Sequence, residues 1–450
     1  MTDRSCLAIV LAAGEGTRMR SKLPKVLHEI GARPMVAHAV ATARAAGADA
    51  VAVVVGPGHD KVAEVAGRAG AGETFVQSER RGTAHAVLCA RAALERGPDT
   101  AIVLYGDTPL VRPATIGRVR EALAAGADVV VLGFQASDPT GYGRLILRDG
   151  TLEAIREERD ATPAERAVDL CNSGIMGFRG SVALALLEAI GDANAKGEYY
   201  LTDAVEIARA RGLATAVVIG GEDEFLGVND RVQLATCEGV FQKRRRAEAL
   251  AAGVTLVAPD SVIFAADTEI AGDVVIEPNV VFGPGVTVAS GARIRAFSHL
   301  EGATVGEGAI VGPYARLRPG AWLGRDVHVG NFVEIKNGRV EDGAKVNHLT
   351  YIGDARIGAK ANIGAGTITC NYDGFGKYHT DIGAGAFVGS NASLVAPVAI
   401  GDGAWVGSGS VVTKDVPADA LVVARAHMIV RPGWASAFRA RKAAERAAKK

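Results

Sequence analysis

Residues 269–300 read EIAGDVVIEPNVVFGPGVTVASGARIRAFSHL, and an aliphatic residue or phenylalanine returns at every sixth position from Ile270 to Leu300. The same period begins at Phe264 and continues to Val412 with single-residue slips. A period of six fits neither an α-helix nor an antiparallel sandwich. It is typical of a parallel β-helix, in which each hexad forms one short side of a coil. We therefore predict a left-handed parallel β-helix with the apolar residues pointing inward and small residues at the corners.

The hexad series has one long interruption. Residues Gly364 to Asp381 are predicted to form a polar insertion, which contains Asn371-Tyr372-Asp373-Gly374. Insertions in solenoids project as loops from one face, and that face is often the binding face.

The N-terminal half follows a different pattern, in which β-rich apolar runs alternate with segments of helical spacing. Such alternation predicts an α/β Rossmann-like domain with a mostly parallel sheet and helices on both faces. Ligands of these sheets bind beyond the carboxyl ends of the strands. The predicted strands are Leu7–Leu11, Ala50–Val55, Ala101–Leu104 and Val129–Leu132, and the predicted helices include Met35–Ala46 and Ala84–Arg96.

Length and composition place few further limits on function. The 450 residues predict a first domain at 1–231, a helical linker at 232–252 and a second domain at 253–450, ending in a basic helical tail. Lys+Arg and Asp+Glu both number 50, so we expect no nucleic-acid partner. No apolar run is long enough for membrane insertion, and five scattered cysteines favour a reducing cytoplasm over a disulfide or zinc framework.

The first predicted strand leads into a glycine loop, Leu11-Ala12-Ala13-Gly14-Glu15-Gly16-Thr17-Arg18, which is followed by Pro24-Lys25. Glycines allow a polyphosphate to approach the backbone, and Arg18 and Lys25 supply positive charge. The spacing matches neither the P-loop nor the dinucleotide fingerprint. A bare glycine turn is the alternative for Gly-x-Gly alone, but the combination with Thr, Arg and Pro-Lys favours a phosphate site.

Asp107 follows another predicted strand, in Tyr105-Gly106-Asp107. A carboxylate at this end of a parallel sheet is a natural anchor for magnesium. Helix capping before Thr108-Pro109 is the alternative.

The second half carries one uneven cluster of polar residues, Arg316, Arg318, Lys336, His348 and Tyr351. Three sides of six residues make one coil, so Arg318 and Lys336, eighteen apart, are expected to stack and clamp a sugar phosphate. A neutral imidazole at His348 could accept the proton that an amine loses when it attacks a thioester. Taken alone, His348 is as well explained as a satisfied polar residue.

Together the glycine loop, the hexads and three motifs resemble one family over residues 5–430. The motifs are Gly141-Tyr142-Gly143-Arg144, Asn172-Ser173-Gly174 and Glu198-Tyr199-Tyr200-Leu201-Thr202-Asp203. The chain is similar to the bacterial bifunctional N-acetylglucosamine-1-phosphate uridylyltransferase/glucosamine-1-phosphate N-acetyltransferases. The resemblance implies acetylation of glucosamine 1-phosphate by acetyl-CoA, then UMP transfer from UTP, giving UDP-N-acetylglucosamine for peptidoglycan and lipopolysaccharide precursors.

The resemblance also implies the residues of the first site. Asp107 and Asn229 would hold Mg²⁺, and Arg18 and Lys25 would neutralise charge during in-line attack on the α-phosphorus of UTP. The residues implied to bind UTP or UDP-N-acetylglucosamine are Leu11, Ala12, Ala13, Gly14, Lys25, Gln77, Gly82, Thr83, Tyr105, Gly106, Asp107, Gly143, Glu157, Asn172 and Asn229.

For the second site, the resemblance implies His348 as the base and a homotrimer of β-helices with acetyl-transfer sites between neighbouring prisms. The acetyl acceptor would be bound by Arg318, Lys336, Tyr351 and Asn362. Acetyl-CoA would be bound by Ala365, Asn371, Tyr372, Ser390, Ser408 and Arg425, with Lys377 contributing to either ligand. Ser408 departs from the alanine common in relatives, a small change.

Two alternatives remain at the level of sequence. One is a one-headed sugar-1-phosphate nucleotidylyltransferase whose β-helix is only a scaffold; the combination of His348 with Arg318 and Lys336 argues against it. The other is an acetyltransferase whose first half only binds ligands; Asp107, Asn229 and Pro24-Lys25 argue against that.

Overall fold

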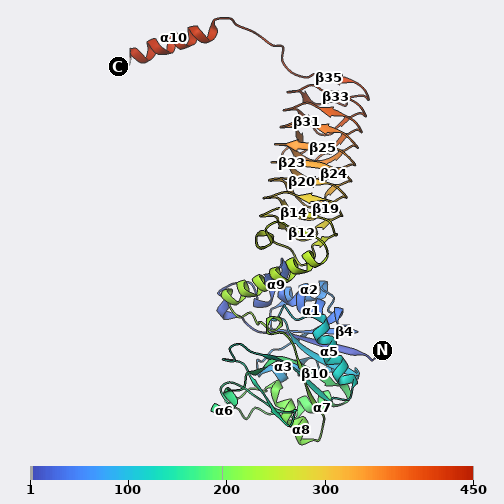
Figure 1. Ribbon diagram of the computed structural model, residues 1–450, viewed down its shortest axis with the longest axis vertical. Helices are drawn as coiled ribbons and strands as arrows, with labels where there is room; N and C mark the ends of the chain where they lie inside the picture. Colours follow the sequence, from blue (N-terminus) through green and yellow to red (C-terminus); the bar gives the residue numbers. More distant parts are fainter. Residues whose placement is uncertain (1–3, 195, 449–450) are drawn as a thin grey trace. The chain divides into compact units, whose positions relative to one another are not determined.

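The computed structural model describes residues 4–194 and 196–448 and divides them into two compact units. Unit 1 comprises residues 1–248 and 264–266, and unit 2 comprises residues 249–263 and 267–450, within the described ranges. Figure 1 shows an α/β fold in the first and a stack of short strands in the second. Both predicted fold classes are confirmed.

The sheet of unit 1 has the strand order β11-β7-β10-β6-β1-β4-β5, with the β8–β9 hairpin beside β10. Along this order the strands are parallel except β10, which runs antiparallel to both β6 and β7. The hairpin strands also pair antiparallel, β8 with β10 and β9 with β8. The sequence analysis did not predict the reversal of β10. The bounds are β1 (Cys6–Ala12), β4 (Ala50–Val55), β5 (Glu73–Val76), β6 (Thr100–Tyr105), β7 (Val129–Gln135), β8 (Arg144–Arg148), β9 (Thr151–Arg156), β10 (Leu170–Arg179) and β11 (Thr215–Ile219), with a separate ribbon of β2 (Glu29–Ile30) and β3 (Arg33–Pro34).

The helices agree with the predicted spacing, except that the expected helix 84–96 is divided at Ala90 into α3 and α4. The linker helix is present as α9 and the tail helix as α10. The bounds are α1 (Met35–Ala45), α2 (Asp60–Arg68), α3 (Thr83–Cys89), α4 (Arg91–Leu94), α5 (Pro113–Ala124), α6 (Pro163–Arg166), α7 (Gly180–Glu188), α8 (Ala204–Ala210), α9 (Arg231–Ala251) and α10 (Trp434–Ala447).

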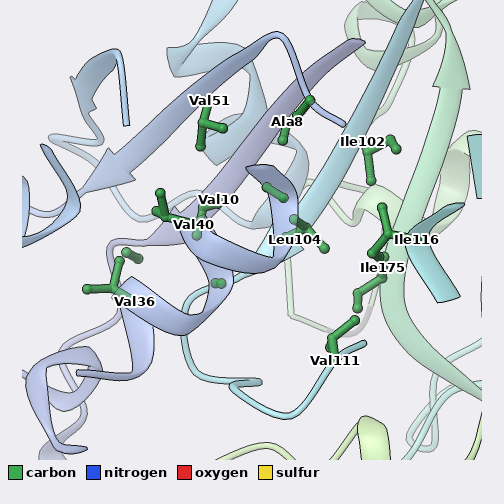
Figure 2. Packing of buried hydrophobic residues seen from close by; sticks show 14 of the residues in the cluster. Ala8, Val10, Val36, Val40, Val51, Ile102, Leu104, Val111, Ile116 and Ile175 are labelled. Atoms are coloured by element: carbon green, nitrogen blue, oxygen red, sulfur yellow. The ribbon is translucent and has the colours of Figure 1, made fainter. Parts of the chain in front are cut away.

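The two faces of β1 pack into two different cores. Side chains alternate across a strand, so Ala8 and Val10 lie on one face, with Val36 and Val40 of α1 (Figure 2). Leu7 and Ile9 belong to the opposite core, with Val87 of α3 and Leu186 of α7. Burial of β1 on both faces explains its unbroken apolar sequence.

The chain leaves β1 toward β4 and β5 and then crosses to β6, on the other side of β1. The carboxyl ends of β1 and β6 therefore form a topological switch point, the place where open α/β sheets bind ligands. The glycine loop follows β1, and Asp107 follows β6.

Unit 2 is a parallel β-helix whose strands pair one coil apart; for example Val275 pairs with Arg293, eighteen residues on, which pairs with Ile310, seventeen residues further. Pairings across the inserted loop span twenty-five residues, as between Ala355 and Thr380. The hexad residues lie inside, and Ile276, Ile294 and Leu317 are fully buried. One ladder contains β12 (Thr255–Leu256), β14 (Val275–Ile276), β17 (Arg293–Ile294), β20 (Ile310–Val311), β23 (His328–Asn331), β25 (Lys345–His348), β27 (Asn362–Ile363), β30 (Phe387–Val388), β33 (Trp405–Val406) and β35 (Leu421–Val422).

The remaining strands of the β-helix form a second hydrogen-bonded sheet. They are β13 (Glu269–Ile270), β15 (Val281–Phe282), β16 (Thr287–Val288), β18 (His299–Leu300), β19 (Ala303–Val305), β21 (Arg316–Leu317), β22 (Ala321–Leu323), β24 (Glu334–Val340), β26 (Tyr351–Ile357), β28 (Ile368–Cys370), β29 (Thr380–Ile382), β31 (Ser393–Val395), β32 (Val398–Ile400) and β34 (Val411–Val412).

The predicted interruption at 364–381 is wrong in extent, because residues 368–370 form β28 inside the coil. Thr369 fills the inward position and is fully buried. Its hydroxyl accepts a hydrogen bond from Gly353 N at 2.8 Å and donates to Gly353 O at 3.1 Å. A polar residue is tolerated inside because its hydroxyl is satisfied. The inserted loop is therefore only Asn371–His379.

Candidate active sites

Three side chains meet at the switch point of the sheet. Lys25 Nζ donates to Asp107 Oδ2 at 2.5 Å and to Asn229 Oδ1 at 3.1 Å. Lys25 is buried and opens a single 3-10 turn, Asp107 follows β6, and Asn229 precedes α9. The helix-capping alternative for Asp107 is wrong, because α5 begins only at Pro113.

A cavity of about 340 Å³ opens beside these residues. Of the implied nucleotide-binding residues, Leu11, Ala12, Ala13, Gly14, Lys25, Gln77, Gly82, Thr83, Tyr105 and Asp107 line it, together with Val26, Arg80, Ala86 and Glu198. Arg18 is exposed and is not among the lining residues, whereas Arg80 lines the cavity and forms an ion pair with Glu15.

The remaining implied sugar-binding residues lie around Tyr105. Asn172 N donates to Gly143 O at 2.8 Å, and Thr202 Oγ1 donates to Glu157 Oε1 at 3.5 Å. Burial, reinforced by the carboxylates of Asp107 and Glu157, raises the pKa of the Tyr105 hydroxyl. Burial likewise raises the pKa of Glu157. Tyr105 therefore lies close enough to both Asp107 and Glu157 for their charges to act on its hydroxyl.

Gly82 shows why the Glu198-Tyr199 motif belongs to the same site. Its φ is +115°, and a β-carbon at this position would lie 2.5 Å from Tyr199 O. Ala84 N donates to Tyr199 O, and Tyr199 N donates to Arg81 O. A side chain at position 82 would push these two segments apart, so glycine is required.

The oxygen donors at the switch point suit a divalent cation. Asp107 Oδ2 and Asn229 Oδ1 converge on one positively charged group, the ammonium of Lys25. Carboxylate and amide oxygens are ligands that Mg²⁺ accepts. Within residues 4–194 and 196–448, no three His, Cys, Asp or Glu side chains gather as a metal site. A metal here would therefore take most of its ligands from phosphate oxygens and water.

In the β-helix, His348 ends β25 one coil above Asn331 of β23. His348 Nδ1 lies 2.8 Å from Asn331 Oδ1. Because an amide oxygen only accepts hydrogen bonds, Nδ1 carries the proton and Nε2 keeps its lone pair in the neutral ring. The exposed His348 therefore has the tautomer of a base with Nε2 available.

Basic side chains from neighbouring coils form a second group. Arg318 and Lys336 follow the paired residues Leu317 and Ile335, as the eighteen-residue spacing predicted. Arg318 Nη1 donates to Glu334 Oε1 at 2.8 Å, and this bond raises the pKa of Arg318. The adjoining amino group of Lys377 lowers the pKa of Lys336. An anion bound between the two lysines would relieve their repulsion.

The inserted loop is held against the coil beneath it. Asn371 is buried and donates Nδ2 to Asp354 Oδ2 at 2.5 Å. Asp373 Oδ1 accepts from Phe375 N and Gly376 N and so fixes the turn. Tyr372 is left exposed. These contacts bring Lys377 of the loop to Lys336 of the coil.

The other implied acetyl-CoA residues lie higher on the β-helix. Arg425 Nη1 donates to Ser408 O at 2.7 Å, and Asn391 N donates to Ala365 O at 2.7 Å. Ser390 and Ser408 both follow the glycine after a ladder strand, at the same corner of successive coils. Tyr351 pairs with Glu334, and Asn362 begins β27.

Sequence reasoning missed Asn331, Glu334, Arg80 and His85. Asn331 and Glu334 were recoverable, because each lies one coil, seventeen residues, before His348 and Tyr351. Arg80 and His85 carry no periodic signal; only the fold brings them to the cavity or to Gln77.

The fold and these two groups of residues define a transferase with a nucleotidyltransferase unit and a hexapeptide-repeat unit. The family models match accordingly: a MobA-like NTP transferase domain over residues 8–169 and a bacterial transferase hexapeptide of six repeats over residues 302–337.

The chain belongs to the family of bifunctional GlmU proteins. It is 60% identical to the bifunctional protein GlmU of Xanthobacter autotrophicus over 441 residues, 98% of each chain. The GlmU protein of Nitrobacter hamburgensis is 61% identical over 98% of this chain and 97% of its own length. The GlmU protein of Rhizobium etli is 59% identical over 449 residues, which cover 100% of this chain and 99% of that protein.

This membership confirms the prediction of a bifunctional enzyme with acetyltransferase and uridylyltransferase activities, and it does not favour the one-headed alternative. The reaction of such nucleotidyltransferases requires a divalent metal. None of the helices within residues 4–194 and 196–448 combines the length and apolar character needed to cross a membrane.

Proposed function

We propose that unit 2 acetylates glucosamine 1-phosphate with acetyl-CoA and that unit 1 then couples N-acetylglucosamine 1-phosphate to UMP from UTP, releasing pyrophosphate. The observation that carries this proposal is that each unit contains its own set of polar side chains suited to one of the two reactions. One set is Lys25–Asp107–Asn229 at a sheet switch point. The other consists of the His348–Asn331 pair and the Lys336–Lys377 pair on the coils of the β-helix.

In unit 1 the nucleophile is already anionic, so the protein needs no general base. Lys25 leaves Asp107 to contact the nucleotide phosphates, and the backbone N–H groups of the glycine loop approach the same phosphates. Arg18 adds charge from the exposed end of that loop. Asp107 and Asn229 would hold Mg²⁺, which supplies charge neutralisation on the phosphate oxygens when bound. Catalysis then consists of positioning and electrostatic stabilisation.

The sugar of N-acetylglucosamine 1-phosphate lies against Tyr105, Gly143, Glu157 and Asn172. The raised pKa of Glu157 reflects an enclosed position, in which its hydrogen bond to a sugar hydroxyl is strengthened. Gln77, Gly82 and Thr83 hold the uracil on the other side of the cavity.

In unit 2 the amino group of glucosamine 1-phosphate attacks the thioester carbonyl of acetyl-CoA. Nε2 of His348 accepts the proton that the amine loses, while Asn331 holds Nδ1–H and thereby orients the ring. Arg318, Lys336 and Lys377 bind the sugar phosphate, with Tyr351 and Asn362 beside them. Acetyl-CoA lies along Ala365, Asn371, Tyr372, Ser390, Ser408 and Arg425, and free CoA leaves as the thiol.

The protein assembles as a homotrimer through the β-helix, and an exposed apolar column supports this. Phe297, Tyr314, Phe332 and Leu349 recur at one corner of successive coils, each with φ between +51° and +59° and about half exposed. The three rings are stacked, with centroids 4.9 and 5.2 Å apart. Bulky residues are costly in the left-handed region, and an apolar column of this kind indicates a covered surface.

This column ends at Leu349, directly after His348, so a neighbouring prism packed on it would enclose the exposed imidazole. Phe332→Asp is expected to yield monomers in sedimentation-velocity experiments and to abolish acetyl transfer while uridylyl transfer continues. A trimer that persists in Phe332→Asp would contradict this arrangement. We also propose a cytoplasmic location, which the substrates and the free cysteines support.

The proposed function is tested by incubating the protein with glucosamine 1-phosphate, acetyl-CoA, UTP and Mg²⁺ and separating the products. UDP-N-acetylglucosamine, CoA and pyrophosphate are expected in equal amounts. Formation of UDP-glucosamine, or of N-acetylglucosamine 1-phosphate alone, would contradict it.

A further inference from the structure

Gln77 lies at the wall of the nucleotide cavity, directly after β5. It is buried, and its backbone N–H donates to Val55 O at 2.9 Å, so the main chain holds it in place. The amide nitrogen of its side chain contacts two hydrogen-bond acceptors. Gln77 Nε2 lies 3.2 Å from Gly82 O and 3.3 Å from His85 Nδ1.

These two contacts determine which end of the amide faces the protein. Gly82 O can only accept, so the group opposite it must be the –NH₂ of Gln77. Gly82 O also accepts from Ala86 N at 3.1 Å, and a carbonyl oxygen in its place would meet another oxygen. Nδ1 of His85 accepts the second N–H only in the tautomer that is protonated at Nε2. Gln77 Oε1 has no hydrogen-bond partner among the described residues and is the acceptor that remains for a ligand.

We propose that His85 is a positioning residue that selects the nucleotide base by fixing the amide of Gln77. This inference rests on the proposed binding of a uridine nucleotide in the cavity. With its –NH₂ held by Gly82 and His85, Gln77 offers an oxygen acceptor. Uracil presents an N–H donor at N3, whereas cytosine presents a lone pair at N3. The fixed amide pairs with uracil and repels cytosine.

The location of His85 suits this role. It lies in the first turn of α3, whose start is fixed by Gly82 against Tyr199. His85 O accepts from Cys89 Sγ at 3.3 Å, so the residue is anchored from the next turn of the helix as well. The ring is not among the residues that line the cavity, and it acts on the base only through Gln77.

The test compares kcat/KM for UTP and CTP, with N-acetylglucosamine 1-phosphate and Mg²⁺, in four variants. His85→Leu and His85→Ala remove the acceptor, and the UTP/CTP ratio is expected to fall about five- to tenfold, the effect of one hydrogen bond. His85→Asn keeps an oxygen acceptor near the position of Nδ1 and is expected to retain the ratio within about twofold. Glu95→Gln, an exposed position directly after α4, is the control and should keep the wild-type ratio.

Acetyl transfer by unit 2 and the thermal midpoint of each variant report whether it has folded. The inference is overturned if both acceptor-deleting variants lower the two kcat/KM values equally, or if His85→Asn loses the ratio as they do. A wild-type protein that uses CTP as well as UTP, or neither, would instead refute the proposed uridylyl transfer. The two failures are therefore distinguishable.

Discussion

The two sites of this chain are built in opposite ways. In unit 1, segments distant in sequence converge, so that Lys25, Asp107 and Asn229 meet around a largely buried ammonium. In unit 2, the outer surface of the repeating coil carries His348, Lys336 and Tyr372, and His348 is exposed. The sheet switch point gathers side chains from distant segments around one cavity, whereas the outer face of the β-helix leaves His348 open to solvent.

His348→Ala should produce the largest effect and should affect one site only. Loss of the proposed general base is expected to reduce acetyl transfer by about 10²- to 10⁴-fold. Uridylyl transfer from UTP to N-acetylglucosamine 1-phosphate should stay within about twofold of wild type. Separate assays of CoA release and pyrophosphate release measure the two. Comparable losses in both assays would show that the sites are not independent.

Asp107→Ala is the converse change. Removing the carboxylate takes away one of the two proposed protein ligands for the divalent metal, and uridylyl transfer is expected to fall by about 10²- to 10³-fold. Acetyl transfer should be unaffected, because unit 2 contains none of these residues. Glu64→Gln, an exposed carboxylate of α2, serves as a matched control and should leave both rates unchanged. Retained pyrophosphate release in Asp107→Ala would remove Asp107 from the site.

Asn331→Ala tests whether the tautomer of His348 matters. Without the acceptor at 2.8 Å, the ring can rotate and place its proton on Nε2, and acetyl transfer should fall about tenfold. Asn331→Asp keeps an acceptor and should recover most of the rate. An unchanged rate in Asn331→Ala would show that the ring is oriented by other contacts.

The smallest predicted effect is on stability in unit 1. Burial, with repulsion from Glu206 and Glu157, raises the pKa of Asp203 to about 6. The folded state then binds more protons than the unfolded state between about pH 4 and pH 6. This carboxyl therefore destabilises the fold progressively as the pH rises through that range.

Asp203→Asn should consequently stabilise unit 1 at pH 8, by about 1 kcal/mol after allowance for solvent screening of a partly exposed group. The gain should vanish near pH 4, where the wild-type carboxyl is protonated in the folded state. The thermal midpoint of unit 1 as a function of pH measures this. A gain that is independent of pH would assign the effect to packing instead.

The same contrast explains what the sequence could predict. In the β-helix, a fixed period relates sequence to space, and hexad residues such as Ile276, Leu317 and Ile352 are all buried. The predicted length of the insertion was too great, because the pattern of apolar residues breaks at Thr369, a polar residue that nevertheless occupies an inward position. Asn331 was missed although the period places it one coil below His348.

In unit 1, periodicity predicted where strands and helices lie in the sequence but not which strands pair with each other or in which direction. The antiparallel direction of β10 depends on pairing with β6 and β7, which are distant in sequence. The nucleotide site was predicted from family resemblance, because Glu157 and Asn172 carry no local signal. The link between Gln77 and His85 depends on where α3 begins, which is set by contact with Tyr199.

The central claim is that one chain holds two independent transferase sites, and a complementation assay tests it most directly. Neither His348→Ala nor Asp107→Ala alone should convert glucosamine 1-phosphate, acetyl-CoA, UTP and Mg²⁺ to UDP-N-acetylglucosamine at an appreciable rate. A mixture of the two purified variants should restore the conversion, because each supplies the site that the other lacks. Full conversion by either variant alone, or no restoration by a mixture in which both half-reactions are active, would contradict this account.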